Sequence, residues 1–566
     1  MSRITRRQLG PAVAAALAAP AVPAPDEKPK EPREAAADAL LEVVKLRYGK
    51  QLDAAKLKAV RGSLVTNWPA ERLRRAATGG EPAFAFGGVA VRRPSVLIPP
   101  ATLYLTIPEL GERLRKRDFS SEELTRAYLD RLEDVGPKLG AVVTVMREQA
   151  LKEAKQADAE LKARKDRGPL HGIPYGAKDL LATNGVPTTW GAEPFRKQVF
   201  DHDATVVTKL RNAGAVLIAK LAMVELAGGF GYNRADASFT GPCKTPWNLD
   251  YWSGGSSSGS GAAVAAGLVA FAIGSETSGS IITPASFCGI SGLRPTYGRV
   301  SRHGAMALSW TLDKVGPMGR AAEDCGLVLA AIAGRDPLDP STAARVFRYP
   351  QAKEKTRFRI GIVAGAADRV QPEVKKNFEA TLKVLAGFAE LVDGVKLPEM
   401  PFGDVLGTVL RAEEASAFRD LLDSGDIWRL RTARDKAAAH ATALVLATDY
   451  LQAMRARGPM KKAMHELYIK YDAVLAPGRP TVAYPIDRDF GKAYPEKVSG
   501  PASGSLIVSC NVVGLPALCL PNGLGENGLP TSVQLTGRAW SEARLVAIGQ
   551  AYQKATDWHR KRPPGM

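Results

Sequence analysis

The sequence predicts an α/β protein, in which strands and helices alternate along the chain and pack in layers. Residues 141–146 form a short apolar run typical of a strand, and residues 149–164 follow with a long helical pattern that has one polar face. A second pair follows, a helix from residue 205 that Gly214 closes and a strand at 215–218. This alternation indicates helices packed against a sheet.

Composition places the 566-residue chain among globular proteins. Hydrophobic residues make up 45% and charged residues 24%, which excludes a disordered chain, and a length of this kind suits several domains or one large α/β unit. The formal net charge of +19 fits a solvated basic surface. Aromatic residues are only 7% and no basic run interleaves with them, so no nucleic-acid partner is expected.

The first residues have the features of an export signal. Arg6 and Arg7 precede an uncharged stretch, 9–25, that ends in small residues around Ala24. The arginine pair resembles the bacterial twin-arginine signal, and prolines interrupt the stretch too often for a transmembrane helix. We therefore expect residues 1–24 to be a signal peptide, the mature protein to be periplasmic or secreted, and no stable membrane anchor. A disordered basic terminus is the alternative.

Composition and hydrophobic pattern divide the rest of the chain into two parts. Residues 25–105 indicate a charged, alanine-rich helical extension followed by a Pro/Gly-rich linker, and residues 106–562 the main domain. A capping-type helix start at Ser120 opens the latter. Residues 335–470 are helix-rich and carry no sharp motif, whereas the short apolar runs 473–476 and 505–513 fit buried strands.

Two Gly/Ser-rich loops, at 253–261 and 274–281, flank a predicted small-residue helix at 262–267 and a predicted strand at 268–273. Such an arrangement brings many backbone N–H groups to one end of a sheet. A flexible linker is the alternative, although linkers do not adjoin buried helix and strand patterns in this way.

Familiar catalytic motifs fit these loops poorly. A phosphate-binding loop needs a lysine that neither loop has. Residues 255–259 match the Gly-x-Ser-x-Gly elbow, which would make Ser257 the nucleophile, but no apolar strand precedes it. The five cysteines and six histidines are scattered without metal-ligand spacing, so neither a metal nor an organic cofactor is expected.

Lys178 stands in an unusual setting, because a Pro/Gly-punctuated apolar stretch precedes it. A buried lysine can lose its proton near neutral pH and then act as a base. The alternative is that Lys178 pairs with a carboxylate such as Asp179 and braces a turn.

Taken together, these motifs closely resemble the amidase signature hydrolases, over about residues 106–562. The resemblance implies a large mixed sheet between helices, an amidase domain over 106–562 with a variable helical substrate-channel region at 335–470, and amide hydrolysis without a cofactor. The passages that carry it are 169–179, 254–259, 279–285, 292–301, 514–517 and 528–530.

Matched position by position, the resemblance implies a Ser-Ser-Lys triad. Lys178 is then the base, Ser256 the bridging serine after a cis peptide bond, and Ser280 the nucleophile that forms an acyl-enzyme. The resemblance also implies an oxyanion hole made by the backbone N–H groups of Thr277, Ser278, Gly279 and Ser280.

Departures from the family pattern bear on the substrate. Glu276 replaces an aspartate and Ser278 a glycine, whereas Ile282 and Thr283 stand where many relatives carry an arginine. We therefore expect a small-molecule amide without a carboxylate next to the scissile bond. Two rivals are the A-type component of a tRNA-dependent amidotransferase, which the export signal disfavours, and a non-catalytic binding protein, which retention of the triad disfavours. A homodimer is left open.

Overall fold

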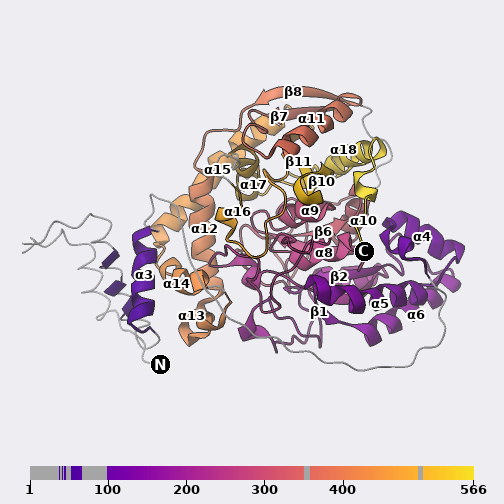
Figure 1. Ribbon diagram of the computed structural model, residues 1–566, viewed down its shortest axis with the longest axis horizontal. Helices are drawn as coiled ribbons and strands as arrows, with labels where there is room; N and C mark the ends of the chain where they lie inside the picture. Colours follow the sequence, from indigo (N-terminus) through magenta and orange to yellow (C-terminus); the bar gives the residue numbers. More distant parts are fainter. Residues whose placement is uncertain are drawn as a thin grey trace, which may run out of the picture.

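The computed structural model is organised around one mixed sheet, which runs through the protein in Figure 1. The structure describes residues 98–349, 357–431, 433–494 and 501–566, together with 52–66 and six positions between 37 and 45. Its eleven described strands lie in the order β1-β3-β2-β4-β6-β5-β10-β11-β9-β7-β8. They are β1 Val142–Val145, β2 Pro174–Lys178, β3 Val216–Leu221, β4 Phe271–Glu276, β5 Ser291–Arg294, β6 Lys314–Gly319, β7 Phe358–Val363, β8 Ala389–Val395, β9 Ala473–Pro477, β10 Ala517–Leu524 and β11 Pro530–Thr536.

Helices cover both faces of this sheet. Strand β10 shows the two faces, because neighbouring side chains of a strand point to opposite sides. Leu518 packs against helix α18 (Glu542–Lys554), whereas Cys519 is paired in register with Gly292, whose face packs against α9 (Ile282–Cys288). Helix α8 (Ser258–Ala265) contacts α9, and α10 (Ala322–Ile332) contacts α18, so each face has its own helix pair.

The described α-helices vary widely in length, and α4 and α5 lie at the right-hand end of the view in Figure 1. They are α3 Ala54–Thr66, α4 Ile107–Lys116, α5 Ser121–Leu139, α6 Arg147–Lys162, α7 Thr205–Asn212, α8 Ser258–Ala265, α9 Ile282–Cys288, α10 Ala322–Ile332, α11 Pro372–Ala386, α12 Phe402–Ala417, α13 Arg419–Ser424, α14 Ala433–Thr442, α15 Ala447–Tyr468, α16 Phe490–Ala493, α17 Pro501–Val513 and α18 Glu542–Lys554.

Small residues let α8 approach the sheet closely. A Cβ atom at Gly259 would lie 2.4 Å from both the Ala141 carbonyl oxygen and the Ala222 nitrogen. All residues of α8 are buried, so any larger side chain would push the helix off β3. The run of glycine, serine and alanine in this part of the sequence is therefore a packing requirement of the helix.

Most predicted elements of the main domain are confirmed. The helix that starts after Ser120 has the expected capping box, in which the Glu123 carboxylate accepts from the Ser120 N–H at 2.8 Å and the Ser120 hydroxyl accepts from the Glu123 N–H. The strand predicted at 268–273 begins three residues later, at Phe271, and the helix predicted at 262–267 begins earlier, at Ser258.

Two predictions were wrong or incomplete. Residues 505–513 belong to helix α17 rather than to a strand, because a short apolar run has no periodicity that separates a buried strand from a buried helix. The helix-rich region 335–470 also contains β7 and β8, which extend the sheet beyond β9.

The N-terminal extension is helical where the structure describes it. Helix α3 packs against α14, at the left of Figure 1, and Leu41, Val44 and Val60 form a small apolar cluster there. Tyr104 is buried and donates to the Ala266 carbonyl at 3.0 Å, so packing against the main domain begins before residue 106. Residues 1–24 and most of the expected linker lie outside the described residues. None of the described helices is long and apolar enough to cross a membrane.

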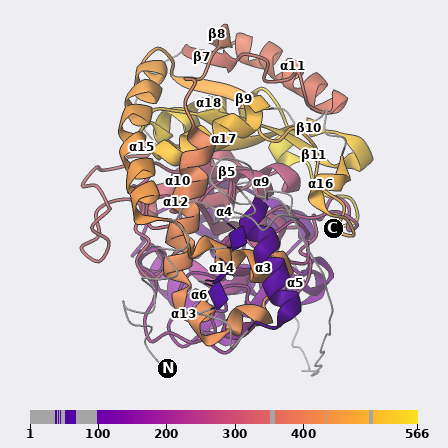
Figure 2. The same ribbon diagram turned by 90° about the vertical axis from the view of Figure 1, so that its left-hand side faces the viewer.

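The turned view in Figure 2 shows the same arrangement from the side of the extension. There α3 lies across the front of the molecule, in front of the lower half of the sheet domain, with α13 and α14 near it. The strands β7 and β8 and helix α11 lie at the opposite end. The division of the chain into an extension, a main domain and a substrate-channel region stays a prediction.

Candidate active site

The predicted catalytic residues come together at one edge of the sheet. Lys178 is the last residue of β2, and β4, which ends at Glu276, runs parallel to β2. Because the carboxyl ends of parallel strands meet at the same edge, the loop that carries Ser280 begins beside Lys178. Ser256 lies in the Gly/Ser loop that enters α8 at this edge.

Lys178 contacts two serines. Its Nζ lies 2.8 Å from Ser256 Oγ and 3.0 Å from Ser275 Oγ, and its side chain is fully buried. The contact with Ser256 agrees with the pairing that the family resemblance implies. The sequence analysis missed Ser275, although it belongs to the second Gly/Ser loop.

Burial controls the charge of Lys178. Loss of hydration lowers the pKa of its ammonium group to about 7, against the opposing attraction of the Asp313 and Glu276 carboxylates. A substantial fraction of Lys178 is therefore neutral at physiological pH. A lysine in that state can accept a proton from a serine hydroxyl.

Asp179 points away from Lys178. Its carboxylate lies 3.2 Å from Lys220 Nζ and accepts from the backbone N–H of Thr189 at 3.0 Å. The alternative in which Lys178 pairs with Asp179 and braces a turn is therefore wrong. Lys220 plays that bracing part instead, and nothing in the spacing of the sequence indicated it.

The loop around Ser256 is packed too tightly to accept side chains. The Gly255–Ser256 peptide bond is cis, as the resemblance implies. A Cβ atom at Gly255 would lie 2.7 Å from Val224 and 2.8 Å from the Trp252 ring. The backbone N–H of Val224 donates to the Ser256 carbonyl at 3.1 Å and holds the same loop from the other side.

Ser257 is not available as a nucleophile. Its hydroxyl donates to the Ser275 carbonyl at 3.1 Å and accepts from the Ser275 N–H at 3.2 Å, and it is fully buried. No described strand leads directly into it. The elbow interpretation therefore fails, and the Ser257 hydroxyl fastens the first Gly/Ser loop to the end of β4.

Ser280 follows the end of β4 and precedes α9. Its carbonyl accepts from the Ser257 N–H at 3.3 Å, which joins the two Gly/Ser loops directly. Among the described residues, no hydrogen bond uses the backbone N–H of Thr277, Ser278, Gly279 or Ser280. The four N–H groups that the resemblance assigns to an oxyanion hole therefore have no partner among the described residues.

Glu276 holds the nucleophile loop in place. Its carboxylate accepts from the backbone N–H groups of Ile281 and Ile282 at 2.8 and 3.0 Å, from Asn511 at 2.8 Å and from Arg294 at 2.6 Å. Burial by itself would raise the pKa of Glu276, but Arg294 and the other donors lower it to about 2. The replacement of aspartate by glutamate thus preserves a buried anchor.

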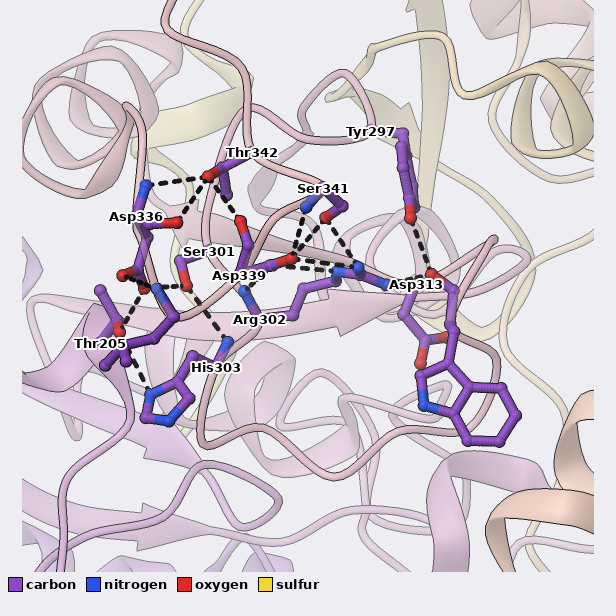
Figure 3. Close-up of polar contacts among 12 residues, drawn as sticks. Thr205, Tyr297, Ser301, Arg302, His303, Asp313, Asp336, Asp339, Ser341 and Thr342 are labelled. Carbon is purple, nitrogen blue, oxygen red and sulfur yellow. Dashed lines mark hydrogen bonds and ion pairs between the residues drawn. The ribbon is translucent and has the colours of Figure 1, made fainter.

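A cavity of roughly 230 Å³ adjoins the catalytic loops on the side of Ser275 and Thr277. Arg302 lines this cavity, and Figure 3 shows it beside Asp339 and Ser341. The Arg302 guanidinium lies 3.4 Å from the Asp339 carboxylate and donates to the Ser341 hydroxyl at 2.7 Å, so this cation is already matched by a carboxylate. The cavity is otherwise lined mainly by aliphatic side chains.

The described residues contain neither a disulfide nor a metal-binding cluster. All five cysteines are buried and unpaired, as expected for small apolar side chains. In the part of the chain that the structure describes, no group of His, Cys, Asp and Glu is arranged to hold a metal ion.

Comparison with known proteins agrees with this geometry. A family model described as Amidase matches residues 123–546. The chain belongs to the amidase signature family. As a member it is a hydrolase that acts on the C–N bond of amides, and the predicted α/β fold with a large mixed sheet is confirmed.

The similar proteins are named either as amidotransferase components or as amidases. The chain is 37% identical to the A-type component of the glutamyl-tRNA(Gln) amidotransferase of Moorella thermoacetica over 490 residues, 81% of this chain and 98% of that protein. It is 30% identical to the peptide amidase of Stenotrophomonas maltophilia, with a TM-score of 0.70 over 82% of this chain and 99% of that structure. A bacterial aryl acylamidase has a TM-score of 0.72 over 82% of this chain and 99% of that structure, but at 22% identity it supports the fold alone.

Because the buried carboxylate of Glu276 stabilises the fold only in its charged form, we expect the stability of the protein to depend on pH. Its pKa is depressed from 4.5 to about 2, so its contribution is fully present above pH 4.5 and is lost as the pH falls toward 2. We expect Glu276→Gln to destabilise the protein by about 3–5 kcal/mol at neutral pH, because Arg294 would stay buried without its counter-charge. That difference should shrink by about 3 kcal/mol between about pH 5 and pH 2.

Urea unfolding followed by circular dichroism, on wild type and variant across this pH range, measures both quantities. A difference between the two proteins that stays constant with pH would contradict the assignment of Glu276 as a buried anion.

Proposed function

We propose that the protein hydrolyses a carboxylic amide through an acyl-enzyme on Ser280, with Ser256 as the bridging hydroxyl and Lys178 as the base. The observation that carries this proposal is the state of Lys178. Its amine is fully buried, its pKa lies at about 7, and its Nζ is 2.8 Å from Ser256 Oγ. A base of that pKa can work at neutral pH.

The chemistry follows from these three groups. Neutral Lys178 takes the proton of Ser256, Ser256 takes the proton of Ser280, and Ser280 Oγ bonds to the amide carbon. When the tetrahedral intermediate collapses, the C–N bond breaks and the same relay returns the proton to the leaving nitrogen. Water then attacks the ester, which frees the Ser280 hydroxyl and releases the carboxylic acid.

The nucleophile loop supplies electrostatic stabilisation. The loop of residues 277–280 is fixed by two hydrogen bonds: the Glu276 carboxylate accepts from the Ile281 N–H, and the Ser280 carbonyl accepts from the Ser257 N–H. Donors that are fixed before the reaction need not reorganise when charge develops on the carbonyl oxygen. Each such donor is typically worth about 3–4 kcal/mol in the transition state.

Two substrate classes fit this machinery. The sequence relatives favour the A-type component of a tRNA-dependent amidotransferase, since relatives of that name are 34–37% identical over at least 97% of their own length. They support that alternative better than the free-standing exported amidase that the sequence analysis preferred. The amidase class draws support from the likeness to peptide amidase and from Ile282 and Thr283, which offer no positive charge to a substrate carboxylate.

A substrate panel separates the two classes. Purified protein is tested for release of ammonia or amine from glutamine and from aliphatic, aryl and peptide amides, with Ser280→Ala as the control. Hydrolysis of neutral amides by the isolated chain supports an amidase, whereas ammonia release confined to glutamine supports an amidotransferase component. Equal rates for wild type and Ser280→Ala on every substrate would overturn the proposed function.

The assignment of Lys178 as the base predicts how kcat/KM depends on pH. Because Lys178 must be neutral, kcat/KM should rise with pH through about 7. Arginine keeps the charge but can hardly deprotonate, so Lys178→Arg should lose activity almost as completely as Lys178→Ala. Steady-state kinetics over about pH 5 to 10 checks this, with circular dichroism to confirm folding. An arginine variant that kept more than about a tenth of wild-type activity would show that Lys178 is not the base.

We also propose that residues 1–24 export the protein, with the arginine pair read by the export machinery. Replacing Arg6 and Arg7 together by lysine should leave the protein in the cytoplasm, as measured by fractionation and immunoblotting. Wild-type protein found only in the cytoplasm would refute export, and it would also strengthen the amidotransferase alternative because tRNA is present there.

A further inference from the structure

Helix α12 carries two adjacent buried carboxylic acids, Glu413 and Glu414, each with 3% of its surface exposed. They serve different loops. Glu414 accepts from the Phe230 N–H at 2.9 Å, and burial raises its pKa to about 8. Glu413 instead faces the turn at residues 308–313, which belongs to the wall of the cavity beside the catalytic loops.

Glu413 holds this turn with several hydrogen bonds. It accepts from the Thr311 N–H at 3.1 Å, from the Thr311 hydroxyl at 2.9 Å and from the Ser309 hydroxyl. The Tyr450 hydroxyl of α15 also donates to it, at 2.9 Å. Every hydrogen bond of this buried carboxylate is thus directed to the turn or to the neighbouring helix.

The same turn reaches the catalytic machinery through Asp313. One oxygen of Asp313 accepts from the backbone N–H groups of Leu308 and Ser309, at 2.9 Å each, which closes the turn. The other accepts from the Thr277 hydroxyl at 2.6 Å, in the loop that carries the expected oxyanion donors. Asp313 is also one of the two carboxylates that act electrostatically on Lys178.

We propose that Glu413 is a positioning residue for amide hydrolysis: it fixes the 308–313 turn, so that Asp313 keeps its place between Thr277 and Lys178. The proposal rests on the role of Lys178 given above. Glu413 touches neither the substrate site nor Lys178, and acts only through the turn.

Other groups hold the turn at different points. Arg457 of α15 donates to the Thr311 carbonyl at 2.9 Å, and the Tyr297 hydroxyl donates to the Trp310 carbonyl at 2.8 Å, a bond that Figure 3 shows near Asp313. Both of these side chains donate hydrogen bonds to backbone carbonyls of the turn. Glu413 is the group from α12 that holds the N–H and hydroxyl donors of the turn.

We expect loss of Glu413 to change the pKa of Lys178. The charged groups that act on Lys178 are Asp313 and Glu276, and both raise its pKa. Lys314 follows Asp313 in sequence, and its Nζ donates to Asn511 at 2.7 Å; burial disfavours its charged form and lowers its pKa. If the turn loosens and Asp313 withdraws, the pKa of Lys178 falls further and the rise of kcat/KM moves to lower pH.

The test compares Glu413→Ala, Glu413→Gln and the control Asp404→Asn, which changes an exposed carboxylate on the same helix. We expect Glu413→Ala to lower kcat about tenfold or more and to shift the acid limb of kcat/KM by roughly half to one pH unit downward. Glutamine keeps an oxygen acceptor, so Glu413→Gln should stay within about threefold of wild type and keep the limb in place. Asp404→Asn should match wild type.

A second variant approaches the contact from the other side. Ser309→Ala combined with Thr311→Val removes the two hydroxyl donors and leaves α12 untouched, so it should reproduce the shift even if Glu413→Ala does not fold. A lower rate with an unmoved acid limb in both variants, or an unchanged rate, would overturn the proposal.

A failure of the proposed function can be told apart from a failure of the Glu413 proposal. If Lys178→Ala keeps its activity and the wild-type acid limb, the limb does not belong to Lys178, and both the base assignment and this inference fall. If Lys178→Ala is inactive, as expected, and the limb of the two turn variants stays at the wild-type pH, only the role of Glu413 is refuted.

Discussion

The buried carboxylate of Glu276 joins the parts of the molecule on which the site depends. It ends β4, accepts from the first N–H groups of α9, pairs with Arg294 at the end of β5 and accepts from Asn511 of α17. Three consecutive elements, β4, α9 and β5, therefore meet the distant helix α17 at one charge. A buried anion with this many donors has few alternative arrangements, because each lost hydrogen bond leaves a desolvated polar group.

Around this anchor, the enzyme balances two opposing effects on Lys178. Full burial disfavours the ammonium, while Asp313 and Glu276 favour it, and the result is a pKa of about 7 against 10.5 for an ordinary lysine. That shift corresponds to roughly 5 kcal/mol of differential stabilisation of the neutral amine. Asp179, the nearest carboxylate in sequence, is paired with Lys220 and is not among the charges that act on Lys178.

Membership in the amidase signature family leaves the substrate to be decided by what surrounds the shared site. Helices of the 335–470 region contribute to those surroundings in a way that their lack of motifs conceals. Glu413 and Glu414 on α12 each hold a different loop beside the cavity, and Arg457 on α15 holds one of the same loops from another direction. Variation in these helices can therefore alter the surroundings of the cavity without changing Lys178, Ser256 or Ser280.

The sequence alone determined the α/β class and the family, and it predicted which residues form the site. Local composition carries that information: only small residues fit α8 against β3, and Lys178, Ser256 and Ser280 lie in motifs specific enough to recognise. The helical state of residues 501–513 and the partners Ser275, Lys220, Asp313 and Glu413 were decided by tertiary structure. Each depends on contacts between segments far apart in the chain, and no local pattern records which buried polar group will satisfy which donor.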